Sequence, residues 1–351
     1  KKNNANWLNL ALDNQWHYII VDLGTANTLV YARGGIVLRE PSVVAIQAGS
    51  KRVLAVGAEA KRMLWKTPET ITAIRPLKDG VIADYEITQS MLKHFIKKAM
   101  GSRSFVRPRI LVGVPSGVTE VEKRAVIDAT IEAGAREAYL IEEPMATAIG
   151  AGLPVQEATG SMVVDIGGGT CEVAVISLGG IVVSKSVRSG GDSIDAAIVR
   201  YIRKKFNLLI GERTAEEIKL TVATVSKNGR DTAIEVRGRD MVTGLPTTFS
   251  VTSADCRNAL EDSVASLIAA VRGVLEKCPP ELASDIVDNG IYLTGGGALL
   301  DGLAEIMQAE TGIDIHIAEN PLDCVAVGTG KALQSLDKLH PGTIYTSSNL
   351  V

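Results

Sequence analysis

The sequence predicts an α/β protein in two lobes, and three observations support this prediction. Its 351 residues are more than one hydrophobic core usually holds, so two domains or one strongly lobed domain are expected. Apolar residues make up 46% of the chain, aromatic residues only 4%, and there are 34 glycines. This balance suits buried parallel strands joined by tight turns. The third observation is an internal duplication.

The duplicated unit is a β-hairpin whose turn is rich in glycine and hydroxyl side chains. In the first copy an apolar strand over residues 18–21 leads into Asp22 and a Gly/Thr turn, and a second strand follows over residues 28–32. In the second copy residues 162–164 lead into Asp165 and the turn 167–170, followed by a strand over residues 172–177. A Gly-Gly break ends both copies. Two equivalent lobes that each present one hairpin are the natural inference.

Between the hairpins, the predicted elements alternate between strand and helix. Residues 109–115 indicate a buried strand followed by a turn. Thr119 and Glu122 form a capping box that opens a helix ending near Gly134. A strand over residues 138–141 comes next, and Pro144 is well placed as the first residue of the following helix.

The last third of the chain continues this alternation. Residues 232–251 look like a more polar, β-rich insert. An apolar stripe over residues 264–275 predicts an amphipathic helix that stops before Pro279. Residues 290–294 predict a strand that leads into three glycines and then a helix.

Composition and charge exclude several classes of protein. The 37 basic and 40 acidic residues give a formal charge of −3, so nucleic acid is not expected as a partner. The four cysteines lie far apart, which argues against a zinc site and suits a reduced, cytosolic protein. No apolar run approaches a membrane span. Residues 1–16 contain a short amphipathic pattern, which we expect to be an N-terminal extension rather than a membrane-binding helix.

The glycine-rich turns indicate a site for phosphates. Without a Cβ atom, backbone N–H groups can approach an anion closely, and neighbouring hydroxyls add donors. Two such turns facing each other across a cleft would hold a polyphosphate from both sides. Asp22 and Asp165 come at strand ends just before the turns, where open α/β sheets bind ligands. Such a pair of carboxylates would hold Mg²⁺ through its waters.

Two familiar nucleotide-binding motifs are missing. No GxxxxGK[ST] sequence occurs, because Gly330 and Lys331 are followed by Ala332. No GxGxxG follows a predicted strand either. The sequence therefore disfavours a P-loop NTPase and a Rossmann dehydrogenase.

Several motifs resemble those of one family. The segments 22–28 (DLGTANT), 165–170 (DIGGGT) and 293–300 (LTGGGALL) are similar to the two phosphate motifs and the adenosine motif of the actin and heat-shock-chaperone ATPase superfamily. The segments 40–45, 75–84, 114–119, 142–146, 211–216 and 325–333 resemble the MreB family of bacterial actins in the same order. Together they cover about residues 17 to 335.

This resemblance implies an actin-like ATPase fold, with two lobes that each contain a duplicated ribonuclease-H-like core and a nucleotide in the cleft between them. Lobe I would span residues 17–155, with a small subdomain at about 42–85 and a C-terminal return at about 333–345. Lobe II would span residues 156–332, with an insert subdomain at about 192–253. Residues 346–351 would form a tail.

The resemblance also implies roles for individual residues. Asp22 and Asp165 would organise Mg²⁺ through water, beside bound ATP or ADP. The residues expected to hold the phosphates are Gly24, Thr25, Ala26, Asn27, Gly167, Gly168, Gly169 and Thr170. Those expected around ribose and adenine are Gly191, Asp192, Glu216, Lys219, Gly295, Gly296, Gly297 and Ala298. From the sequence alone, Glu216 and Lys219 would more often be an i, i+3 surface pair on a helix.

Hydrolysis needs a group that orients or deprotonates the attacking water. Glu142 and Glu143 end a predicted strand, and their spacing does not decide which one faces the cleft. The resemblance selects Glu143 as the catalytic residue, assisted by Asp165 and by Thr170 at the γ-phosphate. Cys171 stands where the family generally has a second threonine, a departure that bears on turnover more than on binding.

At the level of the cell, the resemblance implies a slowly hydrolysing ATPase that forms paired protofilaments and controls cell shape or motility. Its filaments would lie at the cytoplasmic face of the inner membrane on anionic lipid, and Phe105 and Val106 are the loop residues expected to insert. Further implied partners are other bacterial actins and shape or division proteins. The main alternative is a small-molecule kinase of the same superfamily. A chaperone ATPase ranks lower, because we expect no peptide-binding domain in the short segment given after residue 335.

Overall fold

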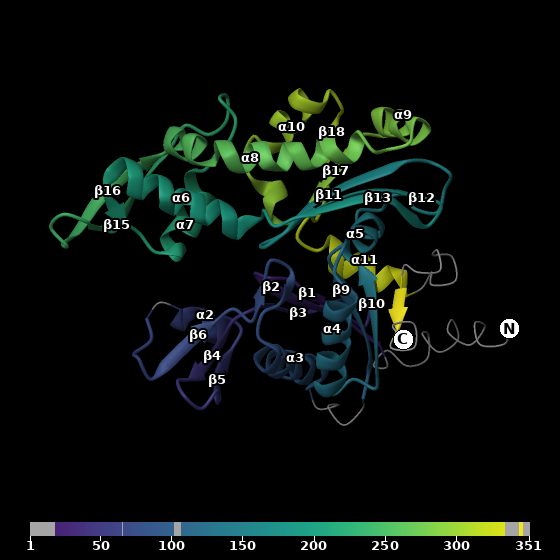
Figure 1. Ribbon diagram of the computed structural model, residues 1–351, viewed down its shortest axis with the longest axis horizontal. Coiled ribbons are helices and arrows are strands. Elements are labelled where there is room, and N and C mark those ends of the chain that lie inside the picture. The colour runs from purple at the N-terminus through teal and green to yellow at the C-terminus, as the bar shows by residue number, and fades with distance from the viewer. Residues whose placement is uncertain (1–17, 65, 102–106, 334–343, 347–351) are drawn as a thin grey trace.

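The computed structural model describes residues 18–64, 66–101, 107–333 and 344–346. Two sheets with their flanking helices form two lobes, one above the other in Figure 1. The expected N-terminal extension lies outside the described residues. Within the described part of the chain, no helix combines the length and apolar character needed to cross a membrane.

The first lobe is built on a six-stranded sheet with the order β19-β10-β9-β1-β2-β3. The strand bounds are β1 Tyr18–Leu23, β2 Asn27–Ala32, β3 Gly35–Pro41, β9 Arg109–Val114, β10 Glu137–Glu142 and β19 Ile344–Thr346. β1 and β2 are antiparallel and form the first predicted hairpin, whereas β9 runs parallel to both β1 and β10. Helices α3 (Tyr85–Met100) and α4 (Glu120–Glu132) share one hydrophobic core with this sheet.

The second lobe is built on a five-stranded sheet with the order β13-β12-β11-β17-β18. Its strands are β11 Ser161–Ile166, β12 Cys171–Ser177, β13 Gly180–Val187, β17 Ile291–Thr294 and β18 Ile315–Ile317. The antiparallel β11–β12 pair is the second predicted hairpin, and β17 runs parallel to β11. The helices associated with this lobe are α6 Gly191–Phe206, α7 Glu212–Val222, α8 Ser253–Leu275, α9 Pro280–Asn289 and α10 Leu303–Thr311.

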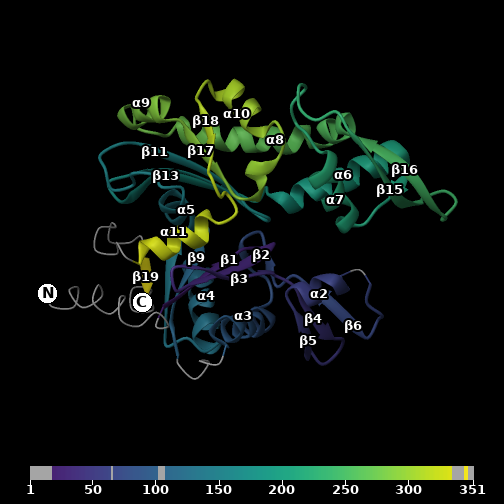
Figure 2. The ribbon, with the colours of Figure 1, turned by 180° about the vertical axis from the view of Figure 1, so that it is seen from behind.

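Two helices lie between the sheets in both views of the molecule (Figures 1 and 2). They are α5 (Glu143–Gly150) and α11 (Cys324–Ala332). Apolar residues of both helices share a core with both sheets, for example Met145 with Leu111 of the first and Val163 of the second. The helices approach so closely that a Cβ atom on Gly328 would lie 1.7 Å from the carbonyl oxygen of Ala146. This contact requires glycine, and it joins the lobes through a packed interface.

A small sheet extends each lobe. In the first lobe it consists of β4 (Val44–Gln47), β5 (Val53–Val56) and β6 (Ile71–Ile74), next to α2 (Ala58–Met63). In the second it consists of β14 (Leu208–Leu209), β15 (Ala233–Asp240) and β16 (Pro246–Thr252). β15 and β16 confirm the predicted β-rich insert. A further two-stranded hairpin is formed by β7 (Leu77–Lys78) and β8 (Val81–Ile82).

The helix boundaries follow the local signals closely. Thr119 and Glu122 form the predicted capping box of α4, with both reciprocal hydrogen bonds present. The prediction for Pro144 is off by one residue, because α5 begins at Glu143 and the proline lies within its first turn. A proline is tolerated there because the first N–H groups of a helix have no intrahelical acceptor. After β17 the glycine-rich segment forms a short 3₁₀ helix, η3 (Gly296–Leu299), ahead of α10.

Candidate nucleotide site

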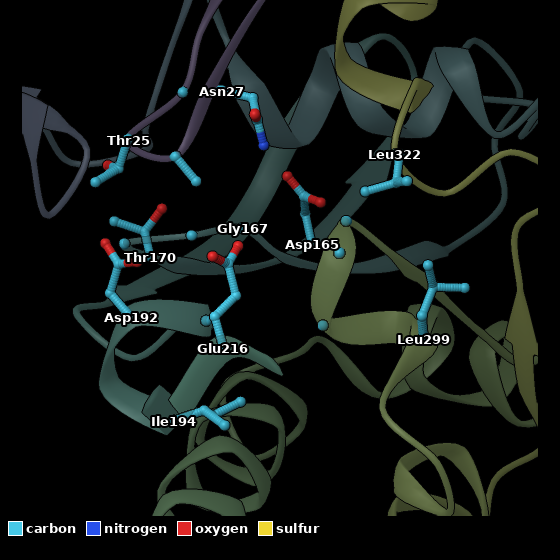
Figure 3. Close-up of a pocket in the computed structure, with 18 of the residues that line it drawn as sticks. Thr25, Asn27, Asp165, Gly167, Thr170, Asp192, Ile194, Glu216, Leu299 and Leu322 are labelled. Carbon is cyan, nitrogen blue, oxygen red and sulfur yellow. The ribbon is translucent and has the colours of Figure 1, made fainter. Parts of the chain in front are cut away.

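A cavity of about 510 Å³ lies between the lobes and brings the two glycine-rich turns together. This volume is within the range of small-molecule and cofactor sites. In Figure 3, Thr25 and Thr170 lie at one side of the cavity, Leu299 and Leu322 at the other, and Asp165 points between them. The sequence-predicted residues that line it are Asp22, Gly24, Thr25, Ala26, Asn27, Glu143, Asp165, Gly167, Gly168, Gly169, Thr170, Gly191, Asp192, Glu216, Lys219, Gly295, Gly296 and Gly297.

The first turn joins β1 to β2 and is braced by two neighbouring segments. Ser42 donates from its hydroxyl to the Gly24 carbonyl at 2.6 Å and from its backbone N–H to the Ala26 carbonyl at 3.0 Å. The hydroxyl of Thr25 accepts a hydrogen bond from the backbone N–H of Gly80 at 3.0 Å. Gly80 lies in the turn between β7 and β8, so the small hairpin supports the first glycine-rich turn.

The second turn joins β11 to β12 and is held by the start of α6. The Gly167 N–H donates to the Thr170 carbonyl at 2.9 Å, which closes the turn. The N–H groups of Gly191 and Asp192 donate to the carbonyls of Gly167 and Gly168, at 2.9 and 2.8 Å. The predicted Gly-Asp segment is therefore a helix start that positions the turn.

The two turns meet face to face. A Cβ atom on Gly168 would lie 2.6 Å from the Cβ of Ala26, and one on Gly169 would lie 2.6 Å from the hydroxyl of Thr25. Real Cβ atoms do not approach this closely, so only glycine allows the backbones to converge. The arrangement suits an anion held from both sides.

Two carboxyl groups, Asp22 and Asp165, stand beside the turns and carry strongly altered acidity. Burial and then the charge of Asp165 raise the pKa of Asp22 to about 7, although Arg39 acts in the opposite direction. Burial raises the pKa of Asp165 to about 6, against a hydrogen bond of 3.0 Å from the Thr294 hydroxyl. Both raised pKa values mean that the negative charges of the ionised carboxylates are not fully offset by neighbouring groups, because burial removes the water that would stabilise them.

The cationic side chains that line the cavity offset this negative charge only in part. In the described part of the chain each of them pairs with another carboxylate, in the ion pairs Arg39–Asp323, Lys61–Glu216, Arg75–Asp192, Lys219–Asp195 and Arg230–Asp301. Within the same residues no three His, Cys, Asp or Glu side chains converge as direct metal ligands. Two under-compensated carboxylates without a full ligand set suit a divalent cation that keeps its waters, as Mg²⁺ does.

The structure separates the two adjacent glutamates. Glu142 is the residue before α5, and its carboxylate accepts a hydrogen bond of 2.7 Å from the Tyr345 hydroxyl of β19. Glu143 lines the cavity and is buried. Burial, then the charges of Glu172, Asp22 and Asp165, raise the pKa of Glu143 well above its usual value. Glu143 is therefore the one of the pair that faces the turns.

Glu172 is a second buried carboxylate near Glu143, and no sequence pattern singles it out. It lies opposite Asp165 in the β11–β12 ladder. Its carboxylate accepts hydrogen bonds from the Ser116 N–H at 3.0 Å, the Ser116 hydroxyl at 2.6 Å and the Ser186 hydroxyl. Ser116 follows β9 of the first lobe, so its two hydrogen bonds to Glu172 connect the lobes.

The other end of the cavity combines ion pairs with apolar side chains. Glu216 and Lys219 of α7 do not form the i, i+3 surface pair that the sequence alone suggested. Glu216 pairs with Lys61 at 3.1 Å, and Lys219 pairs with Asp195 at 2.9 Å. Apolar wall residues missing from the sequence predictions include Ile194, Leu299, Leu300 and Leu322.

Some predicted residues lie elsewhere. Ala298 does not line the cavity, and its side chain is packed in the core of the second lobe. Cys171 is fully buried in β12. Phe105 and Val106 lie outside the described residues.

Comparison with known proteins identifies the family. The model of the family described as MreB/Mbl protein matches residues 17–341. The chain belongs to the MreB/Mbl family. The cell shape-determining protein MreB of Escherichia coli strain K12 is 56% identical over 333 residues, covering 93% of this chain and 95% of that protein. Mbl of Bacillus subtilis strain 168 is 53% identical over 320 residues, covering 91% and 96%.

Solved structures confirm the predicted actin-like fold of this MreB/Mbl chain. MreB 5 of Spiroplasma citri bound to AMPPNP matches with a TM-score of 0.87 at 38% identity, covering 92% of this chain and 97% of that one. The same protein bound to ADP gives the same values. The MamK double helical filament matches with a TM-score of 0.77 at 21% identity, covering 92% and 100%, and so supports the fold alone. These relatives do not favour the alternative of a small-molecule kinase.

Proposed function

We propose that this MreB/Mbl-family chain binds ATP, hydrolyses it slowly and polymerises into filaments that control cell shape or motility. The observation that supports this most is the cavity in which two facing glycine turns, Asp22, Asp165 and Glu143 come together. The 56% identical MreB carries the name of a cell shape-determining protein, and MreB 5 of Spiroplasma citri binds AMPPNP and ADP.

In this proposal the two turns bind the phosphates of ATP or ADP between them. Both turns line the cavity, and the N–H groups offered to the phosphates come from residues 24–27 and 168–170, together with the hydroxyls of Thr25 and Thr170. Asp192, Glu216 and Lys219, together with Gly191 and residues 295–297, surround ribose and adenine. The apolar side chains of Leu299 and Leu322 face the same space and suit a purine ring.

Asp22 and Asp165 would hold Mg²⁺ through its coordinated waters. Their raised pKa values indicate uncompensated negative charge, which a divalent cation offsets. When bound, the cation neutralises charge on the phosphates and favours departure of ADP. The phosphate turns contain no lysine, so the remaining neutralisation comes from backbone amides and hydroxyls.

For hydrolysis, we assign Glu143 as the group that orients and deprotonates the attacking water. The water oxygen bonds to the γ-phosphorus, the bond from that phosphorus to the bridging oxygen of ADP breaks, and the water proton passes to the Glu143 carboxylate. The raised pKa of Glu143 makes its carboxylate a better proton acceptor once it is ionised. Thr170 would donate from its hydroxyl toward the γ-phosphate, and Asp165 would hold the cation together with Asp22.

The proposal extends to organisation and partners. We propose lobe I at 17–155, with the C-terminal return at about 333–345, and lobe II at 156–332; the strands β1–β10 and β11–β18 fall within these two ranges. We also propose self-association into paired protofilaments on the cytoplasmic face of the inner membrane. Anionic lipid, met by Phe105 and Val106, is the proposed attachment. Other bacterial actins and shape or division proteins are the proposed protein partners.

The enzymatic part is tested by comparing Glu143→Ala with Glu142→Ala. Loss of the general base should lower the rate of phosphate release by about a hundredfold or more, with the Kd for ADP unchanged. Glu142 is an adjacent carboxylate held outside the cavity by Tyr345, so its variant should release phosphate at the wild-type rate. Equal rates for both variants would refute the assignment of Glu143.

A further inference from the structure

Two ion pairs connect the lobes across the nucleotide cavity. The Lys61 Nζ lies 3.1 Å from Glu216 Oε1, and the Arg75 Nη1 lies 2.7 Å from Asp192 Oδ1. Both cations come from the small subdomain of the first lobe, Lys61 on α2 and Arg75 after β6, and both acids come from helices of the second lobe. All four side chains line the cavity. We name these two contacts the interlobe ion pairs.

The interlobe ion pairs lie at the solvent edge of the cavity. The side chains of Lys61 and Glu216 are 42% and 33% exposed, and those of Arg75 and Asp192 are 28% and 37% exposed. Partly exposed pairs of this kind contribute up to about 1 kcal/mol each and are screened by salt. They can therefore break and re-form readily, unlike the fully packed contact between α5 and α11.

Arg75 pairs with Asp192 and is also attracted by the charges of two further acids. Burial lowers its pKa, but the charges of Asp192, Glu212 and Glu216 more than compensate and keep it above the usual value. Asp192 lies in the first turn of α6, Glu212 in the first turn of α7, and Glu216 one turn further along α7. A first-lobe guanidinium thus pairs with the first turn of α6 and is attracted by two acids of α7. Of these acids, Asp192 and Glu216 line the cavity.

Glu216 and Asp192 are also the acids assigned above to the nucleotide. Each ion pair restricts the side chain of its acid to fewer rotamers. Because each pair also joins the two lobes, it opposes their separation. We propose that Lys61 and Arg75 are positioning residues, which hold Glu216 and Asp192 against bound nucleotide and slow its release by joining the lobes over it. This inference rests on the proposed nucleotide binding.

The test measures the release of tritium-labelled ADP, because this label leaves the ribose unchanged. Protein loaded with labelled Mg-ADP is diluted into excess unlabelled ADP, and the bound label is followed by rapid filtration. Lys61→Ala and Arg75→Ala should each release ADP about fivefold faster than wild type, which corresponds to about 1 kcal/mol. The double variant should be about 25-fold faster if the two pairs contribute independently. Lys61→Arg keeps the charge and should restore slow release.

Matched controls remove ion pairs that stay within one lobe. Lys51 pairs with Glu86 at 2.9 Å in the first lobe, and Arg272 pairs with Glu310 at 2.7 Å in the second. Neither Lys51 nor Arg272 lines the cavity. Lys51→Ala and Arg272→Ala should therefore release ADP at the wild-type rate, although each changes the net charge by the same amount.

The dependence of the release rate on salt, compared between wild type and the double variant, is a second readout that a merely structural role would not change. Raising NaCl from about 50 to about 500 mM shortens the screening length severalfold, so release from wild type should accelerate. The double variant should show a weaker dependence on salt. Release rates of Lys61→Ala and Arg75→Ala equal to those of the controls would overturn the inference, as would equal salt dependence in wild type and double variant. Failure of wild type to bind labelled ADP would instead refute the proposed function.

Discussion

Replacing Asp165 by asparagine should stabilise the protein at neutral pH in the absence of nucleotide and divalent cation. Asp165 is 6% exposed, and burial raises its pKa from 3.8 to about 6. Asparagine removes the charge but keeps an oxygen that can accept the hydrogen bond from Thr294. The variant thus separates the cost of a buried charge from the contribution of the hydrogen bond.

The magnitude follows from linkage between protonation and folding. A raised carboxyl pKa means that the folded state binds more protons than the unfolded state between about pH 3.8 and 6, so stability falls as the pH rises through this interval. Above it, Asp165 destabilises the fold by roughly two pKa units, or on the order of 3 kcal/mol. At pH 5 the same calculation gives about half as much.

Urea unfolding at pH 5 and at pH 7.5, with EDTA present, measures the effect. The free energy of unfolding of Asp165→Asn should exceed that of wild type by about 3 kcal/mol at pH 7.5 and by about 1.5 kcal/mol at pH 5. Asp262 is an exposed residue of α8, and Asp262→Asn should leave the unfolding free energy within about 0.5 kcal/mol of wild type. A variant less stable than wild type at pH 7.5, or a difference that does not change with pH, would refute the reasoning.

Three further predictions concern the same cavity. Gly168→Ala places a methyl group 2.6 Å from the Cβ of Ala26, so the turns must move apart, and calorimetry should show ADP affinity at least about tenfold lower. Gly167→Ala is the control, because the atom nearest to its added carbon lies 3.5 Å away. Equal losses of affinity in both variants would contradict the steric argument. Chelation of divalent cations should weaken ADP binding by at least about tenfold, because no cation then offsets the repulsion between the phosphates and the carboxylates of Asp22 and Asp165. Equal Kd values for ADP with Mg²⁺ and with EDTA would contradict this prediction. Burial raises the pKa of the Cys171 thiol well above its usual value, so this thiol should not react with iodoacetamide in the native protein. Mass spectrometry should find Cys171 unmodified and the half-buried Cys278 modified. Equal modification of both cysteines would contradict the burial of Cys171.

The sequence predicted the parts of the fold that depend on neighbouring residues. The paired hairpins at Asp22 and Asp165 and the capping box at Thr119 each arise from a few consecutive residues, so local chemistry is enough to identify them. The convergence of the two turns could be expected from their duplication. The atomic reason for it, that Gly168 packs directly against Ala26, required the structure.

The rest of the site depends on contacts between distant segments. The sequence could not decide between Glu142 and Glu143, because the decision comes from Tyr345, which lies 203 residues from Glu142. Glu216 was expected from the resemblance, but its partner Lys61 lies 155 residues away and no spacing rule indicates it. Ala298 was grouped with the glycines before it, although a side chain in that position can also pack into the core, as it does here.

Sedimentation of the purified protein with Mg-ATP, with Mg-ADP and without nucleotide shows whether it polymerises in response to nucleotide. Pellets are imaged by negative stain, and phosphate release is assayed in parallel. A nucleotide-binding bacterial actin should pellet in a nucleotide-dependent manner as paired filaments and release phosphate slowly. Protein that stays in the supernatant under every condition, with no phosphate released, would contradict the account.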